Sequence, residues 1–344
     1  MDTMQLDPVT MDSFSVVLVW TAVSLYVLGF LAYAVDLANR SQASLAAKDA
    51  AARGAAAKQL AGVGARGAAG GGGAAEVADA SAAAAPAAPP RYLWGRIGTS
   101  LTWLGFVFHF GATLLRGLAA GRVPWSNMYE FAMTGTLLIT AVYLGVLFWR
   151  DLRFLGAFMT GIVTLLLGAS SLFYVEITPL MDPLKSVWLV IHVFVASLGT
   201  AFFALAFAIS VLQLLQARRE RMAVAAAETP SRRSMLRTIP DAEALEGLAY
   251  RFAIIGFIFW TFTLIAGSVW ANDAWGRYWG FDTKEVWTFI IWVLYAGYIH
   301  ARATRGWRGT RSAWLAIVGF AAVLFNFTIV NMFFEGLHAY SGLS

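Results

Sequence analysis

The sequence predicts an all-α, polytopic integral membrane protein with about eight transmembrane helices and both termini outside. The 344 residues are 59% hydrophobic and 13% charged, whereas soluble domains are typically ~25% charged. Long uncharged apolar runs recur along the chain, and a bilayer-spanning helix needs ~20 such residues. The Lys and Arg residues gather on one side of these runs, and this asymmetry predicts the orientation of the chain in the membrane.

Eight runs are predicted to be spanning helices, because backbone groups inside lipid must bond within their own segment. The runs also lack the polar–apolar alternation of barrel strands. They are Phe14–Val35, Ile97–Leu115, Phe131–Trp149, Phe154–Phe173, Val187–Leu215, Phe252–Trp270, Val286–Ala301 and Ala313–Phe334.

Three regions are expected along the chain. Residues 1–37 form an N-terminal transmembrane helix, residues 38–96 a flexible Ala/Gly-rich cytoplasmic linker, and residues 97–344 a seven-helix membrane domain. The linker includes the run Gly70–Gly73 and cannot bury enough apolar surface to order itself. An Ala-rich part of it can be transiently helical.

The distribution of basic residues orients these spans in the plasma membrane. Of the 25 Lys and Arg residues, 20 fall on the side of the linker and 5 on the opposite side. The linker side is therefore cytoplasmic by the positive-inside rule. The loop that joins the sixth and seventh spans, Trp270–Trp287, then lies on the outer face together with both termini.

This outer loop is unusually aromatic. Four Trp, a Tyr and a Phe lie between Trp270 and Trp287, together with charged residues that include Arg277 and Lys284. Such rings can form an interfacial belt, where Trp and Tyr are generally enriched. They can equally hold a large, flat, apolar ligand with charged edges, such as a porphyrin whose propionates pair with the two cations.

Two histidines are candidate ligands for such a porphyrin. His192 lies near the outer end of the fifth span and His338 just beyond the eighth, so both share the outer face with the aromatic loop. Neutral imidazole is a common axial ligand of haem iron, and two imidazoles can clamp a porphyrin from both sides. Each residue can instead be structural.

The other two histidines lie within predicted spans. His300 is 14 residues past Val286, about 21 Å along its helix at 1.5 Å per residue. An ionisable residue at this depth is a functional candidate, although small neighbours such as Gly297 also suit helix packing. His109 is either a second ligand or a polar helix–helix contact.

Two short segments have the spacing of a helix capping box. Asp282 precedes Glu285 by three residues before the seventh span, and Asn127 precedes Glu130 in the same way before the third. In a capping box the two side chains satisfy amide groups at the helix start. Capping by Asp282 would also fix the angle at which the aromatic loop enters its helix.

Several classes of function have no support. The chain contains no Cys, so it supplies neither a catalytic thiol nor a thiolate ligand. It has no phosphate-cradling glycine motif and no zinc-protease motif. No pattern points to nucleic acid as a partner.

The segment Trp275-Gly-Arg-Tyr-Trp279-Gly-Phe-Asp282-Thr-Lys-Glu285 resembles the tryptophan-rich WWD signature of haem-handling proteins in cytochrome c maturation. Pro124-Trp-Ser-Asn-Met-Tyr-Glu130 and the order of the histidines resemble the system II branch, called CcsA, ResC or, in actinobacteria, CcsB. The resemblance covers roughly residues 100–340.

The resemblance implies that the chain is a subunit of a membrane cytochrome c synthase, a haem lyase, that handles haem b. The expected partners are a ResB-type membrane protein with an outer domain, apocytochrome c with its Cys-x-x-Cys-His segment, and thiol-reducing thioredoxin-like proteins. His192, His338 and His300 would be axial ligands of haem iron. The other residues expected to bind haem are Trp270, Trp275, Arg277, Tyr278, Trp279, Asp282 and Lys284.

Two departures from the family pattern fall in the loop. Phe281 stands where the family usually has Trp, and so lacks an indole N–H. Thr283 stands where it usually has Pro, a residue preorganised for the first turn of a helix.

Two alternatives remain at this level. The chain can be a b-type haem electron-transfer subunit of a membrane oxidoreductase that uses the same histidines. It can also transport another amphipathic substrate without binding haem. The outer position of two of the four histidines, beside a Trp-rich loop, argues against the electron-transfer subunit, and the transporter without haem is ranked last.

Overall fold

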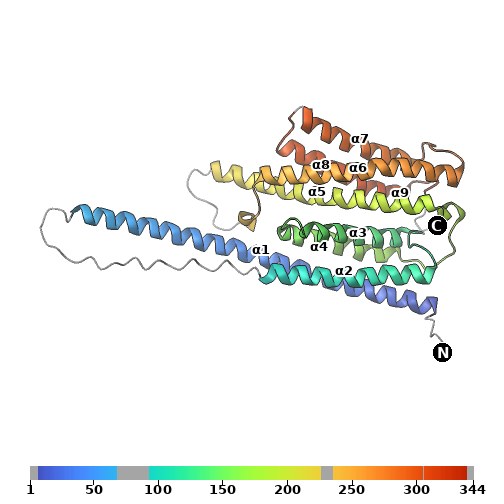
Figure 1. The fold of residues 1–344 in the computed structure, drawn as a ribbon, viewed down its shortest axis with the longest axis horizontal. Coiled ribbons are helices and arrows are strands. Elements are labelled where there is room, and N and C mark those ends of the chain that lie inside the picture. The colour runs from blue at the N-terminus through green and yellow to red at the C-terminus, as the bar shows by residue number, and fades with distance from the viewer. Residues whose placement is uncertain (1–6, 68–92, 226–234, 305, 339–344) are drawn as a thin grey trace.

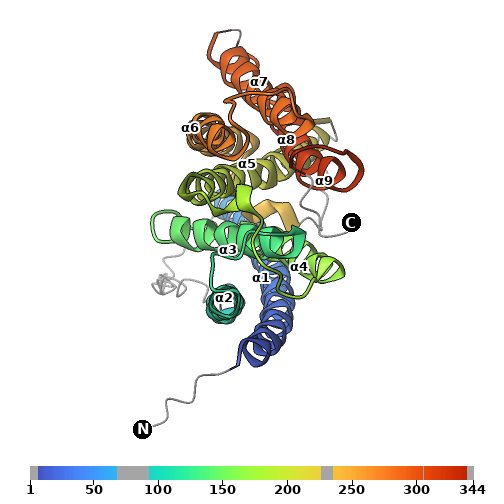
Figure 2. The same cartoon turned by 90° about the vertical axis from the view of Figure 1, so that its right-hand side faces the viewer.

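The helices of the computed structural model run lengthwise beside one another in a stack of pairs (Figures 1 and 2). The structure describes residues 7–67, 93–225, 235–304 and 306–338. All regular structure within these ranges is helical, which confirms the predicted all-α class. The α-helices are α1 (Pro8–Gly67), α2 (Leu93–Ala120), α3 (Met128–Leu147), α4 (Gly156–Ser170), α5 (Val187–Ala225), α6 (Ala242–Trp275), α7 (Thr283–Thr304), α8 (Thr310–Phe327) and α9 (Ile329–Phe333). Short 3-10 helices are η1 (Arg153–Leu155), η2 (Ser171–Phe173), η3 (Asp182–Lys185) and η4 (Met235–Thr238).

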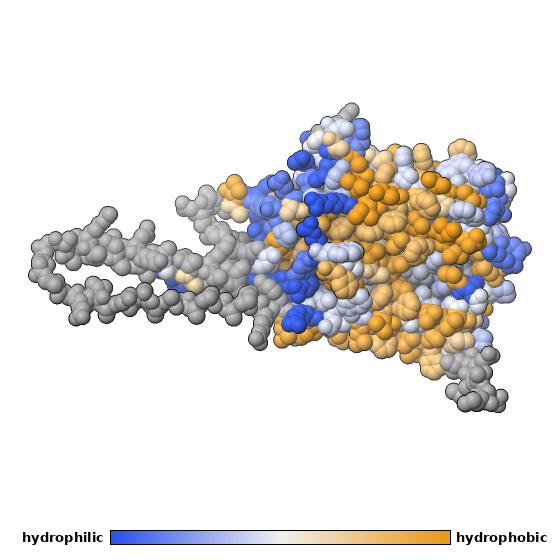
Figure 3. Space-filling view, in the orientation of Figure 1, coloured by the Kyte–Doolittle hydropathy of each residue, from blue (hydrophilic) through white to orange (hydrophobic). Residues whose placement is uncertain are grey.

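The fold is that of a polytopic membrane protein. In the described ranges, 7 helical segments are long and apolar enough to cross a bilayer, and they coincide to within two residues with, or contain, all but one of the predicted spans. The remaining span, Val286–Ala301, lies within the 22-residue α7, whose Trp, Tyr and His residues lower its hydropathy. Figure 3 shows an apolar band around the middle of the molecule, between more hydrophilic ends.

Helix α1 corrects the expected extent of the linker. The linker was predicted to be flexible from residue 38 to residue 96, yet α1 continues to Gly67 and α2 begins at Leu93. Alanine has the highest intrinsic helix propensity, so the Ala-rich stretch after the membrane span extends the helix. The rest of the predicted linker, 68–92, lies outside the described residues.

The last predicted span is interrupted. Helix α8 ends at Phe327 and α9 starts at Ile329, with Thr328 between them at φ −95° and ψ −72°. The Thr328 hydroxyl donates a hydrogen bond to the Leu324 carbonyl at 2.7 Å, an interaction that often bends helices. The break turns the chain near the end of the bundle where the predicted outer residues lie.

Helix α2 packs closely against α1 through small residues. A Cβ on Gly98 would lie 2.9 Å from the Tyr33 ring, and one on Gly105 would lie 2.8 Å from the Tyr26 ring. The absence of side chains at these positions lets the two backbones approach, as is common between helices in membranes.

His109 is a structural contact between three helices. Its ring, 0% exposed, places Nε2 2.9 Å from the Met133 carbonyl of α3. Its Nδ1 lies 3.3 Å from the Tyr26 hydroxyl of α1. Nε2 therefore donates and Nδ1 accepts. Both ring nitrogens have protein partners, which leaves neither for iron.

A buried ionic cluster joins the same helices nearer the end of the bundle at which α1 begins. Arg116 of α2 pairs with Asp12 of α1 at 2.7 Å and with Glu130 of α3 at 3.0 Å. Glu130 also pairs with Arg122 at 2.7 Å. Arg116 donates a further bond to the Val175 carbonyl at 2.7 Å. The two carboxylates are thus fully compensated by two guanidinium groups.

Replacement of Arg116 is expected to destabilise the bundle strongly. Arg116→Met leaves Asp12 without a cationic partner and removes one of the two cationic partners of Glu130, and breaking a buried pair costs about 3–5 kcal/mol. The measurement is thermal or denaturant unfolding of the detergent-solubilised protein. Arg150→Met, at an exposed position, is the control and should change stability by less than about 0.5 kcal/mol. Equal stability of the two variants would contradict the structural role of Arg116.

Candidate functional site

The predicted outer residues come from three parts of the chain that meet at one end of the bundle. These are the start of α5, the loop between α6 and α7, and the segment after α9, all at the right-hand end in Figure 1. Helix α1 begins at this same end. The site is therefore built where several helix ends converge.

Both ends of the aromatic loop are fixed by helix capping. Gly276, with φ 68°, ends α6 by donating to the Asn272 carbonyl at 2.9 Å. Before α7, Glu285 Oε2 accepts from the amides of Gly280 at 2.8 Å and Asp282 at 3.1 Å. Asp282 Oδ2 in turn accepts from the Lys284 amide at 3.3 Å. The predicted capping box is confirmed.

The second predicted capping box has a different geometry. Asn127 caps α3, because its side chain accepts from the Glu130 amide at 3.0 Å. The Glu130 carboxylate does not return to the Asn127 amide but accepts from Ser126 N at 2.8 Å and binds the arginines of the ionic cluster. Because it pairs with Arg116 and Arg122, the Glu130 carboxylate does not complete the capping box.

Asp282 also binds His338, an interaction that the spacing of the chain did not predict. Its Oδ2 accepts from His338 Nδ1 at 2.7 Å, and its Oδ1 accepts from the Leu337 amide at 2.9 Å. A Cβ on Gly336 would lie 2.4 Å from Asp282 Oδ1, so glycine is required for this approach. The His338 hydrogen bond holds the pKa of the Asp282 carboxyl below its usual value. Asp282 is therefore ionised at neutral pH.

His192 is oriented in a similar way from α5. Its Nδ1 lies 3.0 Å from the Thr263 carbonyl of α6, so this nitrogen carries the proton. The ring stacks on Trp270 at a centroid distance of 5.7 Å and an interplanar angle of 16°. A Cβ on Gly267 would lie 2.7 Å from the His192 ring. The small residue therefore makes room for the imidazole.

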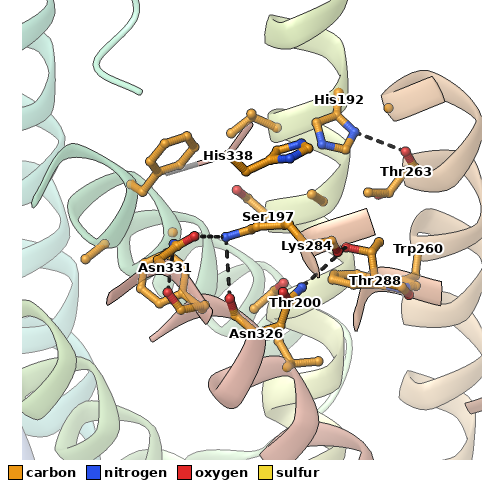
Figure 4. Close-up of a pocket in the computed structure, with 18 of the residues that line it drawn as sticks. His192, Ser197, Thr200, Trp260, Thr263, Lys284, Thr288, Asn326, Asn331 and His338 are labelled. Atoms are coloured by element: carbon orange, nitrogen blue, oxygen red, sulfur yellow. Dashed lines mark hydrogen bonds between the residues drawn. The ribbon is translucent and has the colours of Figure 1, made fainter. Parts of the chain in front are cut away.

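The two imidazoles have the same pattern of hydrogen bonding. In each, Nδ1 donates to an oxygen, and within the described ranges Nε2 has no hydrogen-bond partner. Second-sphere bonds of this kind fix the tautomer and orientation of metal-ligating histidines. Both residues line the same cavity (Figure 4), so the second ring nitrogen of each is left for a ligand there.

The cavity has a volume of about 290 Å³ and mostly apolar walls, contributed by α3 to α9 and the aromatic loop. Six of the predicted site residues line it: His192, Trp270, Tyr278, Trp279, Lys284 and His338. Polar residues that the sequence interpretation missed also line it, among them Ser197, Thr200, Thr288, Asn326 and Asn331. Asn326 and Asn331 fall within the apolar run predicted as the last span. Polar side chains inside a predicted membrane span often mark a functional site, so the sequence could have identified them.

Two predicted residues support the site without lining the cavity. Trp275 packs edge-on against both Trp270 and His338, with centroids 4.8 Å away in each case. Asp282 acts through His338, as described above. Trp270 itself is anchored by a bond from its indole N–H to the Pro183 carbonyl at 2.9 Å. These contacts hold the His338 ring in an aromatic frame.

Two others are not brought to the cavity. Arg277 folds over Gly280, where its guanidinium occupies the space that a Cβ would need, and it is absent from the cavity lining. His300 is exposed on α7 and also lies outside the cavity. The structure therefore separates His300 from the pair formed by His192 and His338.

Phe281 has an unusual backbone conformation for its residue type. Its φ is 56°, in the left-handed region, and its side chain is 80% exposed. An L residue is strained there. Its ring meets Trp279 edge-on at 6.0 Å and does not line the cavity. The missing indole N–H at this position thus removes no contact inside the cavity.

Similarity to known proteins identifies the family of this chain. Residues 125–338 match the family model described as cytochrome c assembly protein, a range that includes both His192 and His338. The chain belongs to the cytochrome c assembly protein family. A member of this family from Guillardia theta, the cytochrome c biogenesis protein CcsA, is 35% identical over 276 residues, covering 70% of this chain and 91% of the relative.

Other comparisons extend the same result. CcsA of Synechococcus sp. (strain JA-2-3B'a(2-13)) is 32% identical, covering 72% of this chain and 83% of the relative. Among solved structures, the cytochrome c haem lyase CcmF aligns with a TM-score of 0.58 at 16% identity. The alignment covers 95% of this chain but 48% of CcmF, so it shows a shared fold for this cytochrome c assembly family member.

Loss of the Asp282 carboxylate is expected to release the segment that carries His338. Asp282→Asn should increase hydrogen exchange at the Leu337 amide, because the charge-assisted bonds to this segment weaken. The pKa of Asp282 is lowered in the folded protein, so its contribution is complete above the ordinary Asp pKa of about 3.9 and is lost as the pH falls below it. The wild type should therefore show the same loosening in that acidic range.

The control is Asp182→Asn, which removes an exposed surface carboxylate near the same end of the bundle. It should leave exchange at Leu337 unchanged. Unaltered exchange in Asp282→Asn would show that this carboxylate does not hold the segment.

Proposed function

We propose that this chain is a subunit of a membrane cytochrome c synthase that carries haem across the membrane and presents it at an outer site. The observation that carries the proposal is the pair His192 and His338. Each has Nδ1 held by an oxygen and Nε2 turned to one apolar cavity beneath the WWD-like loop. Membership of the cytochrome c assembly family supports the same function.

The residues of the cavity suit haem b as cargo. Imidazole nitrogens are common axial ligands of haem iron, and the surrounding aliphatic and aromatic walls suit a porphyrin face. The volume of about 290 Å³ lies at the lower limit of the roughly 300–1,000 Å³ typical of small-molecule sites. We expect the exposed residues Tyr278 and Trp279 to move apart when haem binds.

The site is proposed to face outward from the plasma membrane. The excess of Lys and Arg on the opposite side predicts that the opposite end is cytoplasmic. The start of α1, the aromatic loop and the segment after α9 lie at one end of the bundle (Figure 1), which supports a common outer location for them.

Haem is proposed to reach this site from within the bilayer. His300 would take part in an earlier intramembrane site, with a second ligand from a ResB-type partner. The exposure of His300 on α7 supports the proposal, because its imidazole is accessible from outside the bundle. A bundle of this chain alone then contributes one ligand to the first site and two to the second.

Attachment would join haem to apocytochrome c at the outer face. Each Cys thiol of the Cys-x-x-Cys-His segment adds across one vinyl group, so the sulfur and the hydrogen both end on the former double bond and no net oxidation occurs. The chain has 0 Cys residues, which agrees with thiols supplied by the substrate. Thioredoxin-like partners would keep those thiols reduced, and the histidines would hold the cargo in place.

Loss of either outer imidazole is expected to impair haem retention. His338→Ala and His192→Ala should lose the bis-His absorption bands of the outer haem in the protein purified with its partner, and c-type cytochrome assembly should fall at least tenfold. Added imidazole should restore the bands in part, because it can fill the space left by the side chain.

Phe334→Ala is a matched control, since this residue precedes His338 on the same segment, is exposed and does not line the cavity. It should keep both haem and assembly. Normal spectra and normal assembly in both histidine variants would refute the proposed outer site.

A deletion strain separates this function from the electron-carrier alternative. We expect c-type cytochromes to disappear from haem-stained membranes, because thioether attachment requires the synthase. Intact c-type cytochromes, together with loss of quinol-dependent haem reduction, would instead favour an oxidoreductase subunit.

A further inference from the structure

The inner part of the cavity has a polar floor, defined here as Lys284, Thr288, Asn326 and Asn331. These residues lie below the two histidines in Figure 4. The Lys284 ammonium donates to Asn331 Oδ1 and to the Asn326 carbonyl, the latter at 3.4 Å. Asn326 Nδ2 donates to the Thr288 hydroxyl at 3.3 Å. The floor therefore links α7 with α8 and α9.

The charge of Lys284 has no anionic hydrogen-bond partner in the described part of the chain, where both of its acceptors are neutral oxygens. Lys284 is the only Lys or Arg among the described cavity-lining residues, and Glu285 is the only acidic one. Glu285 directs its Oε2 to the loop amides of Gly280 and Asp282 instead. A cation held among apolar walls is best stabilised by an anion.

The floor also has unused hydrogen-bonding capacity. Asn326 is 5% exposed, and its Oδ1 is buried without a hydrogen-bond partner. Nearly all buried polar groups in proteins have a partner. This oxygen is an acceptor and does not itself bind a carboxylate, so the place for an acidic group of the ligand is set by the Lys284 ammonium, whose own hydrogen bonds go only to neutral oxygens.

We infer that the polar floor is a carboxylate subsite that takes one propionate of the haem, an inference that rests on the proposed function. Lys284 would form the charge-assisted bond. The propionates occupy one edge of the porphyrin. Their burial on the floor therefore turns the opposite edge toward the mouth, where Tyr278 and Trp279 are exposed. Arg277, folded over Gly280, takes no part.

A purely structural role for Lys284 makes a different prediction. Its bond to the Asn326 carbonyl lies next to the break between α8 and α9, so the lysine can be needed only to hold that break. In that case its replacement would lower stability without distinguishing between ligands that have and lack free carboxylates.

The test compares haem with its dimethyl ester, in which both propionates are blocked. Each is titrated into the detergent-solubilised full chain, and the ratio of the two dissociation constants is determined for wild type and Lys284→Met. Comparing the ratios between proteins cancels the different partition of the two porphyrins into detergent. Lys284→Met should reduce the preference for haem over the ester by roughly tenfold to a hundredfold, as expected for loss of one charge-assisted hydrogen bond.

Lys284→Gln keeps a hydrogen-bond donor for the floor but removes the charge, and it should behave like Lys284→Met. Lys284→Arg should retain the preference, and so should Phe334→Ala, at an exposed residue that does not line the cavity. An unchanged ratio in the Met and Gln variants, while both porphyrins still give bis-His spectra, would overturn this inference and leave the proposed function intact. Failure of the wild type to bind either porphyrin would overturn the proposed function itself.

Discussion

The hydrogen bond between Asp282 and His338 is the interaction on which the rest of the site depends. One carboxylate binds the start of α7, the Leu337 amide and the His338 ring at the same time. Without it, the last segment of the described chain has no charged attachment to the aromatic loop. Trp270 and Trp275 then have no fixed imidazole ring to pack against. The position of His338, the entry angle of the loop and the shape of the cavity are therefore set together.

The roles of the histidines differ according to whether the second ring nitrogen has a hydrogen-bond partner within the protein. His109 uses both ring nitrogens for contacts among α1, α2 and α3, and so stabilises the bundle. His192 and His338 each use one nitrogen for orientation and keep the other for the cavity. Burial differs as well, because His109 is fully enclosed whereas His192 and His338 are partly exposed. The free Nε2 is the distinguishing feature for ligand binding.

Much of the fold and part of the site could be predicted from the sequence, because they depend on local patterns. Apolar run length located the spanning helices, and three-residue spacing located the cap formed by Asp282 and Glu285. Features that depend on tertiary contact escaped prediction. The Asp282–His338 pair joins residues 56 positions apart, and the direction of Arg277 is decided by the open space at Gly280. The polar floor required knowledge of which faces of α7, α8 and α9 meet.

The position of His338 has a consequence for biosynthesis. It follows α8 and α9 along the chain, whereas His192 lies in α5. During translation His192 enters the membrane well before its counterpart leaves the ribosome. The pair can thus form only after the last described helices have been made and inserted. An incompletely synthesised chain would lack the second imidazole, and its single remaining ligand would hold cargo weakly at this face. Under the proposed function, completion of the polypeptide is in this way coupled to the ability of this end of the bundle to retain the porphyrin.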